Sequence, residues 1–320
     1  MFRKFLPTLV AAFLCCVSIL AFAQGVPNRQ IWKAGEMSVT VIQDLPGEMQ
    51  SSIFSGPASE EEKSKYFKDG KAEAGVNVFL LRLGGKIVLI DTGMGESAKS
   101  PGKLHAALDQ LGIKPEDVDF VLLTHMHMDH IGGLLLEEKR LLPKKSITPV
   151  ARVIKRLRPE EEKRAFPHAK VLVSKPELGS WLALAEKDPS NANAAQVKLV
   201  AATYGADIQS FAFGESPLPG ITALDASGHT PGHTVFQLKA EGKSLLIVGD
   251  LIHSMPLQFA LPDECASYDM NPSRAISARK HIFALATQEK MEIAGIHFPF
   301  ANAVGTVEKD GNGWKFKRTE

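Results

Sequence analysis

Four metal-binding side chains follow one predicted strand, in the segment Thr124-His125-Met126-His127-Met128-Asp129-His130. The segment begins at the end of the apolar run 118–124, which has the pattern of a buried strand. Alternate residues of an extended chain point to the same side, so His125 and His127 can reach one metal ion. Asp129 and His130 come next, in the turn, and can serve a neighbouring ion. Zn²⁺ favours imidazole and carboxylate ligands. These residues do not complete a site, so the fold must bring further ligands to this strand end.

Apolar runs of strand length recur in two clusters. The first cluster holds 39–42, 76–83, 86–90, 118–124 and 171–174, and the second holds 221–225, 234–238, 244–248 and 293–296. Helices are predicted over 103–111, from about 176 onward, and over 272–288, where Pro272 occupies the first turn. Strand clusters with helices between and after them indicate an α/β fold of two sheets packed face to face, with helices outside.

Further candidate ligands stand at the ends of other predicted strands. The turn-rich segment Gly228-His229-Thr230-Pro231-Gly232-His233 lies between two strands and offers two histidines. Asp250 follows the run 245–248, and His297 ends the last predicted strand. A single Asp or His at such a position is more often structural. Because α/β folds collect their working groups at strand ends, the joint occurrence of these residues predicts one shared site.

The N-terminus has the pattern of an export signal. Arg3 and Lys4 precede the apolar run 5–22, which ends in Ala21-Phe22-Ala23, a small-x-small cleavage pattern. A single membrane anchor is the alternative, because the run has about the length that spans a bilayer. We expect residues 1–23 to be a signal peptide and residues 24–320 to form one domain in the periplasm or outside the cell. No second long apolar run follows, so we expect no membrane contact after cleavage.

Charge and cysteine content narrow the expected partners. The chain has 37 Lys and Arg against 36 Asp and Glu, and the net charge of +1 becomes −1 once residues 1–23 are removed. Charge therefore suggests no nucleic-acid partner, and we expect a small-molecule substrate. Of the three cysteines only Cys265 would remain after cleavage, so the exported chain is expected to form no intramolecular disulfide.

Taken together, these motifs resemble the metallo-β-lactamase fold superfamily in order and spacing across nearly the whole chain after residue 23. The stretches GHTPGHTVFQL and LLIVGDLIHSMPLQFALPDE resemble the methyl parathion hydrolase-like and lactonase-like branch, and Asp91-Thr92-Gly93 also fits the superfamily. The resemblance implies an αββα sandwich, two mixed β-sheets flanked by helices, with a two-metal site at one edge. It implies two divalent metal ions, with Zn²⁺ expected, in these positions: His125, His127 and His229 for one ion, Asp129, His130 and His297 for the other, and Asp250 bridging both. His233 is then expected to support the ligands or pack beside them.

Together with the predicted signal peptide, this resemblance implies an exported binuclear hydrolase. Metal binding lowers the pKa of water from about 15.7 to about 7, so a metal-bridging hydroxide would cleave lactone, aryl ester or phosphotriester bonds. Asp129 would also orient this hydroxide or move its proton. His253 matches the position of a substrate-contacting Tyr in related lactonases, so it is a candidate proton donor or wall of the site, with a structural role as the alternative. Trp181 matches a tryptophan that lines the substrate pocket of the hydrolase branch, with core packing as the alternative.

Other interpretations stay open. A metallo-β-lactamase acting on β-lactam antibiotics would suit export, and a non-catalytic metal-binding protein could share the scaffold. Glyoxalase II-like thioesterases carry a C-terminal helical domain, for which the 23 residues after His297 are too few, and RNA-processing relatives need basic surfaces. The charged insertion near 134–166 is either a solvated flap or a lid over the site. A homodimer would be expected from the family alone, because no residue pattern here supports it.

Overall fold

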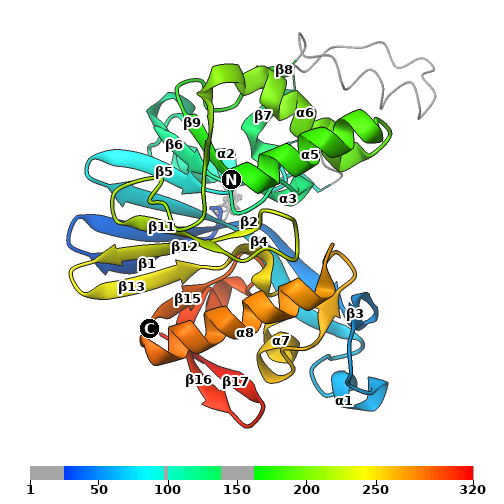
Figure 1. Cartoon of the computed structure of the whole chain (residues 1–320). Coiled ribbons are helices and arrows are strands. Elements are labelled where there is room, and N and C mark those ends of the chain that lie inside the picture. Colours follow the sequence, from blue (N-terminus) through cyan, green and yellow to red (C-terminus); the bar gives the residue numbers. More distant parts are fainter. Residues whose placement is uncertain (1–24, 97–99, 138–161, 320) are drawn as a thin grey trace, which may run out of the picture.

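Two large sheets form the centre of the protein, and helices cover their outer faces (Figure 1). The computed structural model describes residues 25–96, 100–137 and 162–319. The predicted signal peptide and most of the charged insertion lie outside the described residues. The described ends of the insertion pair with each other as the antiparallel strands β7 (Leu135–Glu137) and β8 (Glu162–Arg164).

The first sheet is mixed and contains seven strands in the order β1-β2-β4-β5-β6-β9-β10. Their bounds are β1 Asn28–Ala34, β2 Met37–Gln50, β4 Lys71–Leu83, β5 Lys86–Ile90, β6 Phe120–Leu122, β9 Lys170–Ser174 and β10 Ile208–Phe211. The strands from β1 to β5 pair antiparallel, and those from β5 to β10 pair parallel. Parallel strands end at the same edge of a sheet, so the segments that follow β5 and β6 lie side by side there.

The second sheet is also mixed and contains six strands in the order β11-β12-β13-β15-β16-β17. Their bounds are β11 Ile221–Asp225, β12 Thr234–Ala240, β13 Lys243–Ile247, β15 Glu292–Ala294, β16 Val304–Asp310 and β17 Gly313–Arg318. Strands β13 and β15 pair parallel, and the other neighbours pair antiparallel. The candidate residues Asp250 and His297 follow these two parallel strands.

Alternating side chains show that both sheets are buried on both faces. In β4, Phe79 and Leu81 belong to the core between the sheets, whereas Val78 and Leu80 face the helices of the first layer. In β13, Leu245 and Ile247 belong to the core between the sheets, whereas Leu246 packs beneath helix α8 (Pro272–Gln288). Two apolar faces on the central strands, such as β4, β5 and β13, explain the continuous apolar runs in the sequence. The predicted αββα arrangement is therefore confirmed.

The described α-helices are α1 Glu60–Ser64, α2 Leu104–Gln110, α3 Met128–Ile131, α5 Lys175–Lys187, α6 Ala192–Tyr204, α7 Met255–Ala260 and α8 Pro272–Gln288. Helices α1, α5, α6 and α8 each begin after a capping side chain. Ser174 caps α5 and Asn271 caps α8, each by accepting a backbone N–H of the first turn. Among the described helices, none has the length and apolar character to cross a bilayer. Helix α6 was not predicted, because its apolar residues are spread around the helix instead of lining one stripe.

Candidate metal centre

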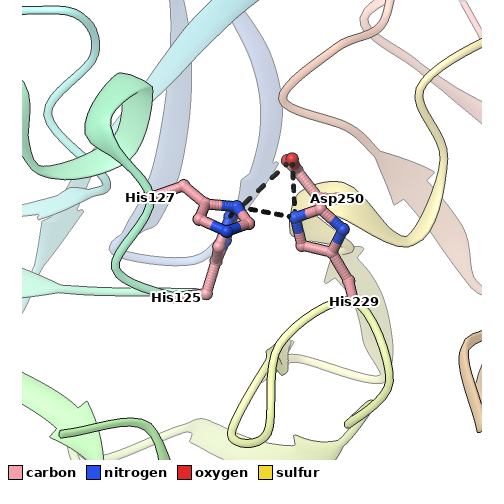
Figure 2. A group of neighbouring side chains, drawn as sticks. All are labelled: His125, His127, His229 and Asp250. Atoms are coloured by element: carbon pink, nitrogen blue, oxygen red, sulfur yellow. Dashed lines mark hydrogen bonds and ion pairs between the residues drawn. The ribbon is translucent and has the colours of Figure 1, made fainter. Parts of the chain in front are cut away.

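Four predicted ligands, three histidines and the carboxylate of Asp250, meet in a first group (Figure 2). His127 Nδ1 lies 2.9 Å from His125 Nε2 and 2.9 Å from His229 Nε2. Asp250 Oδ2 lies 3.3 Å from His229 Nε2 and 3.7 Å from His125 Nε2. The loop after β6 supplies the first two histidines, and the loops before β12 and after β13 supply the other two residues. One ligand atom from each residue lies within 4.8 Å of the others.

Asp129, His130 and His297 form a second group beside the first. Asp129 Oδ2 lies 3.6 Å from His130 Nε2 and 3.6 Å from His297 Nε2. The Asp250 carboxylate reaches this group as well, with Oδ1 3.1 Å from His130 Nε2 and Oδ2 3.2 Å from His297 Nε2. The structure thus brings all seven predicted metal-binding residues together, with Asp250 between the two groups.

The seven donors fit metal ions better than they fit one another. A single ring nitrogen has one in-plane lone pair or one proton, so His127 Nδ1 cannot hydrogen-bond both imidazole nitrogens that it faces. The one Asp250 carboxylate faces the Nε2 atoms of His130, His229 and His297 at 3.1–3.3 Å. A single carboxylate satisfies several buried imidazoles poorly, and imidazole with carboxylate is the donor set that Zn²⁺ prefers. The chemistry of the cluster therefore suits divalent cations.

Neighbouring oxygen atoms fix the tautomer of three of the histidines. The Nδ1–H of His130 donates to Asp91 Oδ2 (2.8 Å), and that of His229 donates to Asp269 Oδ1 (2.9 Å). The Nδ1–H of His297 donates to the Gly75 carbonyl oxygen (2.7 Å). Each bond leaves Nε2 facing the cluster, as oriented metal ligands require. Asp91 stands in a sequence motif that could have revealed this role, but no sequence signal pointed to Asp269.

Glu177, also not predicted, joins the two loops that carry the first group. This buried carboxylate accepts hydrogen bonds from Met126 N (2.9 Å) and Trp181 Nε1 (2.7 Å) through Oε1. Through Oε2 it accepts bonds from Thr230 Oγ1 (2.7 Å) and Gly232 N (2.9 Å). Burial raises the pKa of Glu177, and these four hydrogen bonds oppose that rise. The side chain therefore ties the loop of His125 and His127 to the loop of His229.

His233 supports Asp250 instead of facing the ligand atoms. The backbone N–H of Asp250 donates to His233 Nε2 (2.9 Å), and His233 Nδ1–H donates to the Ala226 carbonyl oxygen (3.2 Å). The preceding Gly249 has a φ of +54°, and a Cβ there would lie 2.5 Å from His233 Nε2. Glycine is needed at this position for both reasons, and His233 has the supporting place expected for it.

Trp181 and His253 both lie against the cluster. The Trp181 ring meets the His127 ring edge-on at 5.4 Å, packs in the core under the first sheet, and lines a hollow of 290 Å³. The His253 ring lies between those of His229 (4.9 Å) and His297 (5.3 Å). Both residues contact predicted ligands, and their roles in substrate binding and proton transfer stay predictions.

The charge of the cluster predicts proton release on metal binding. Burial lowers the pKa of His297, but the charge of Asp250 and its hydrogen bond outweigh burial and raise that pKa to about 9. The carboxylates of Asp250, Asp129 and Asp91 likewise overcome burial and raise the pKa of His130 well above its usual value. Ligating nitrogens must be deprotonated. We expect Zn²⁺ added to metal-free protein at pH 7.5 to release about two protons per chain, measured with a pH indicator in weak buffer.

The same pKa shifts give opposite pH trends for the two forms. Groups with a raised pKa stabilise the metal-free fold fully below their unfolded value, near 6.5, and lose this contribution as the pH rises through the folded value, about 9 for His297. Metal affinity instead rises over that range. Thermal melts with and without Zn²⁺ from pH 6.5 to 9 test this, and parallel trends would contradict protonated histidines in the free cluster.

The comparisons with known proteins agree with this fold. A model of the metallo-beta-lactamase superfamily matches residues 73–285. Among solved structures, hydrolase AbOPH of the beta lactamase superfamily is 25% identical, with a TM-score of 0.76, and the match covers 93% of this chain and 99% of that chain. AidC, a dizinc quorum-quenching lactonase solved with a product, is 22% identical, with a TM-score of 0.75 and coverage of 92% and 98%. At this sequence identity, the likeness to AidC shows that the two proteins share a fold.

Curated relatives share shorter segments. Ribonuclease TTHA0252 of Thermus thermophilus is 29% identical over 187 residues, which are 54% of this chain and 34% of that protein. Exodeoxyribonuclease WalJ of Streptococcus pneumoniae is 40% identical over 58 residues, 18% of this chain and 20% of that protein. The chain thus spans about a third or less of the length of these relatives. With the family model matched over about two thirds of the sequence and the αββα fold in place, the chain belongs to the metallo-beta-lactamase superfamily.

Proposed function

We propose that this protein is an exported hydrolase that uses two divalent cations, expected to be Zn²⁺, to cleave lactone, aryl ester or phosphotriester bonds in small molecules. The observation that carries the proposal is the position of Asp250, whose two carboxylate oxygens face two separate groups of buried ligand atoms. His125, His127 and His229 would hold one cation, and Asp129, His130 and His297 would hold the other. When bound, the cations would supply Lewis acidity and an activated water at neutral pH.

Asp129 is the carboxylate best placed to handle a proton. Its side chain is 29% exposed, whereas the other predicted ligand carboxylate, that of Asp250, is 3% exposed. Burial raises the pKa of Asp129, but the charges of His130 and His297 outweigh it and lower that pKa, which keeps the carboxylate ionised at neutral pH. Asp129 would therefore orient the attacking water at the open side of the site and hold its proton during the reaction.

Apolar side chains around the cluster support an uncharged, partly apolar substrate. In the described parts of the chain, the large hydrophobic side chains that stay exposed are Met128, Tyr268 and Met270. Met128 follows His127 in the chain, the Tyr268 ring lies 5.7 Å from that of His253, and Met270 N donates to the His229 carbonyl oxygen. Each of these three residues therefore adjoins a residue predicted for the site, in the chain or through a contact. Apolar groups at a binding site favour an acyl or aryl group over a charged one.

A hollow on the α5 side extends this apolar surface. Its 290 Å³ are lined by residues that include Trp181, Leu184, Pro231 and Met270. Pro231 belongs to the His229 loop, and the Trp181 ring touches that of His127, so the hollow adjoins the first group of ligands. We infer that this hollow takes the acyl chain or aryl ring of the substrate while the scissile bond lies at the cations.

Trp181→Ala is expected to raise KM about tenfold for substrates with a long acyl or aryl group, because it removes one wall of the hollow that would hold this group. A substrate with a short group should show little change in KM. Trp181→Phe is the matched control, since it keeps an aromatic ring but loses the hydrogen bond to Glu177. If Trp181→Ala lowers Tm without shifting KM for either substrate, Trp181 is a core residue alone.

The proposal is tested by a hydrolysis panel on metal-loaded protein lacking residues 1–23, with elemental analysis of the same sample. The panel contains N-acyl homoserine lactones, aryl esters, phosphotriesters and the β-lactam nitrocefin. We expect metal-dependent turnover of a lactone or ester, lost on chelation and restored by Zn²⁺. Turnover of nitrocefin alone would make the protein a β-lactamase. A fully loaded protein that is inert on the whole panel would contradict the proposal and favour a metal-binding protein.

A further inference from the structure

His253 occupies the same place around Asp250 as the predicted metal ligands. Its Nε2 lies 3.2 Å from Asp250 Oδ2, and the side chain is 1% exposed. His297 Nε2 lies 3.2 Å from this oxygen, and His229 Nε2 lies 3.3 Å from it. Three imidazole nitrogens therefore surround one carboxylate oxygen at nearly equal distances, and only two of them belong to residues predicted as ligands.

The His253 ring has little protein bonding to explain its burial. Its Nδ1 finds no partner in the part of the chain that the structure describes, and its Nε2 faces only the Asp250 oxygen that His229 and His297 also face. The buried ring of His233, by contrast, uses both of its nitrogens in hydrogen bonds. Buried polar groups in native proteins are nearly always paired, and one carboxylate oxygen faced by three imidazole nitrogens pairs poorly with all of them, which favours a cation shared among these donors.

Packing holds the His253 ring in this orientation. The ring stacks on that of His297, with centroids 5.3 Å apart and planes at 21°. The backbone N–H of His253 donates to Gln258 Oε1 (2.7 Å), and Gln258 Nε2 donates to the Glu264 carbonyl oxygen (2.9 Å). His253 and His297 therefore present Nε2 to the same side, in parallel, from two different loops.

The distances match those between donors that share one ion. Two donors, each about 2.0–2.1 Å from Zn²⁺, lie about 2.9–3.4 Å apart for angles between 90° and 109°. The Asp250–His253 and Asp250–His297 distances, both 3.2 Å, fall in this range. The ligand atoms of Asp250, His253 and His297 also lie within 4.8 Å of one another.

We propose that His253 is an additional metal ligand, which binds the second cation together with Asp250 and His297. The inference rests on the proposed function, because it requires that the cluster holds cations. His253, His229 and Asp269 also lie close together, but Asp269 already accepts the Nδ1–H of His229 and the backbone N–H of Ala266. This leaves the Asp250 and His297 side as the place where His253 would bind.

An extra donor would make the two cation sites unequal. The first site offers His125, His127, His229 and Asp250, whereas the second offers Asp129, His130, His297 and Asp250, and His253 would add a donor on the Asp250 and His297 side. More donors bind a cation more tightly and leave fewer open positions for substrate. We therefore expect two distinct metal affinities in the native chain, with the second site the tighter. A ligating His253 would also not be a free proton donor through Nε2.

The test is a Co²⁺ titration of metal-free protein, followed by visible absorption and by competition with a chelator of known affinity. Loss of an outer partner of a metal ligand already costs roughly 10–100-fold in metal affinity. We expect His253→Ala and His253→Gln to weaken the tighter site by at least about tenfold and to change the visible spectrum of Co²⁺ there. His281→Ala, at an exposed position on α8, is the matched control and should superimpose on the wild type.

Each other outcome has a defined meaning. A wild-type spectrum and affinity in folded His253→Gln, with hydrolysis intact, would overturn the ligand assignment and leave the proposed function standing. An unchanged spectrum with a lower kcat and a shifted pH profile would also overturn it, in favour of a proton donor. Wild-type protein that binds no Co²⁺ would instead defeat the proposed function. If His253→Ala fails to fold, the more conservative His253→Gln decides.

Discussion

Asp250→Asn is expected to lower kcat/KM by at least about 10³-fold, because it removes the charge shared by both ligand groups at the point where transition-state charge is stabilised. Burial raises the pKa of Asp250, but His130, His297 and His125 outweigh burial and hold that pKa well below its usual value. Asparagine keeps the shape of the side chain, but it is neutral and turns an NH₂ group toward imidazole nitrogens. We therefore also expect the bound metal to fall to one ion per chain or fewer.

Elemental analysis and steady-state kinetics on the same preparation measure both effects, and circular dichroism checks that the variant folds. Asp109→Asn, at an exposed position on α2, is the matched control and should keep wild-type metal content and activity. If Asp250→Asn holds two ions and keeps more than a tenth of the activity, the two groups do not depend on a shared carboxylate. The proposal that Asp250 is shared between two cations would then be wrong.

The local part of this site could be predicted from the sequence. Alternation along an extended chain placed His125 and His127 on one side, and both meet in the first group. Asp250 and His297 were predicted from their positions at strand ends, and the parallel pairing of β13 with β15 brings those ends together. The choice of His229 over His233 came from the family resemblance, because both histidines stand in the same turn and spacing alone does not separate them.

Two supporting residues, Asp269 and Glu177, could not be predicted, because their roles exist only in the folded chain. Asp269 orients His229 from 40 positions away, and Glu177 reaches Met126 across 51 positions. Neither residue stands in a motif. Glu177 lies on a helix with exposed charged residues, where a glutamate is normally solvated. A single sequence indicates which side chains can bind a cation, but not which buried carboxylates hold those side chains in place.

Glu177→Ala is expected to destabilise the protein by at least about 3 kcal/mol, because four hydrogen-bond donors lose their acceptor at once in a buried place. For a domain of this size that corresponds to a fall in Tm of roughly 6 °C or more. The same change frees the His125–His127 loop from the His229 loop, so metal affinity should fall roughly 10–100-fold, as for other residues that orient metal ligands. Differential scanning calorimetry and chelator competition measure the two effects.

Two further variants test whether the loss of stability and metal affinity comes from Glu177 itself or would follow from any change to helix α5. Glu186→Ala removes an exposed carboxylate from the same helix, where it pairs with Lys198 at 2.6 Å, and should leave Tm and metal affinity unchanged. Glu177→Gln keeps one acceptor oxygen but turns an NH₂ group toward the remaining donors, so both effects should be intermediate. A fall in Tm with unchanged metal affinity would mean that Glu177 stabilises the fold alone. A fall in both, ordered Ala, Gln, wild type, requires that one buried carboxylate holds the two ligand loops at their working separation.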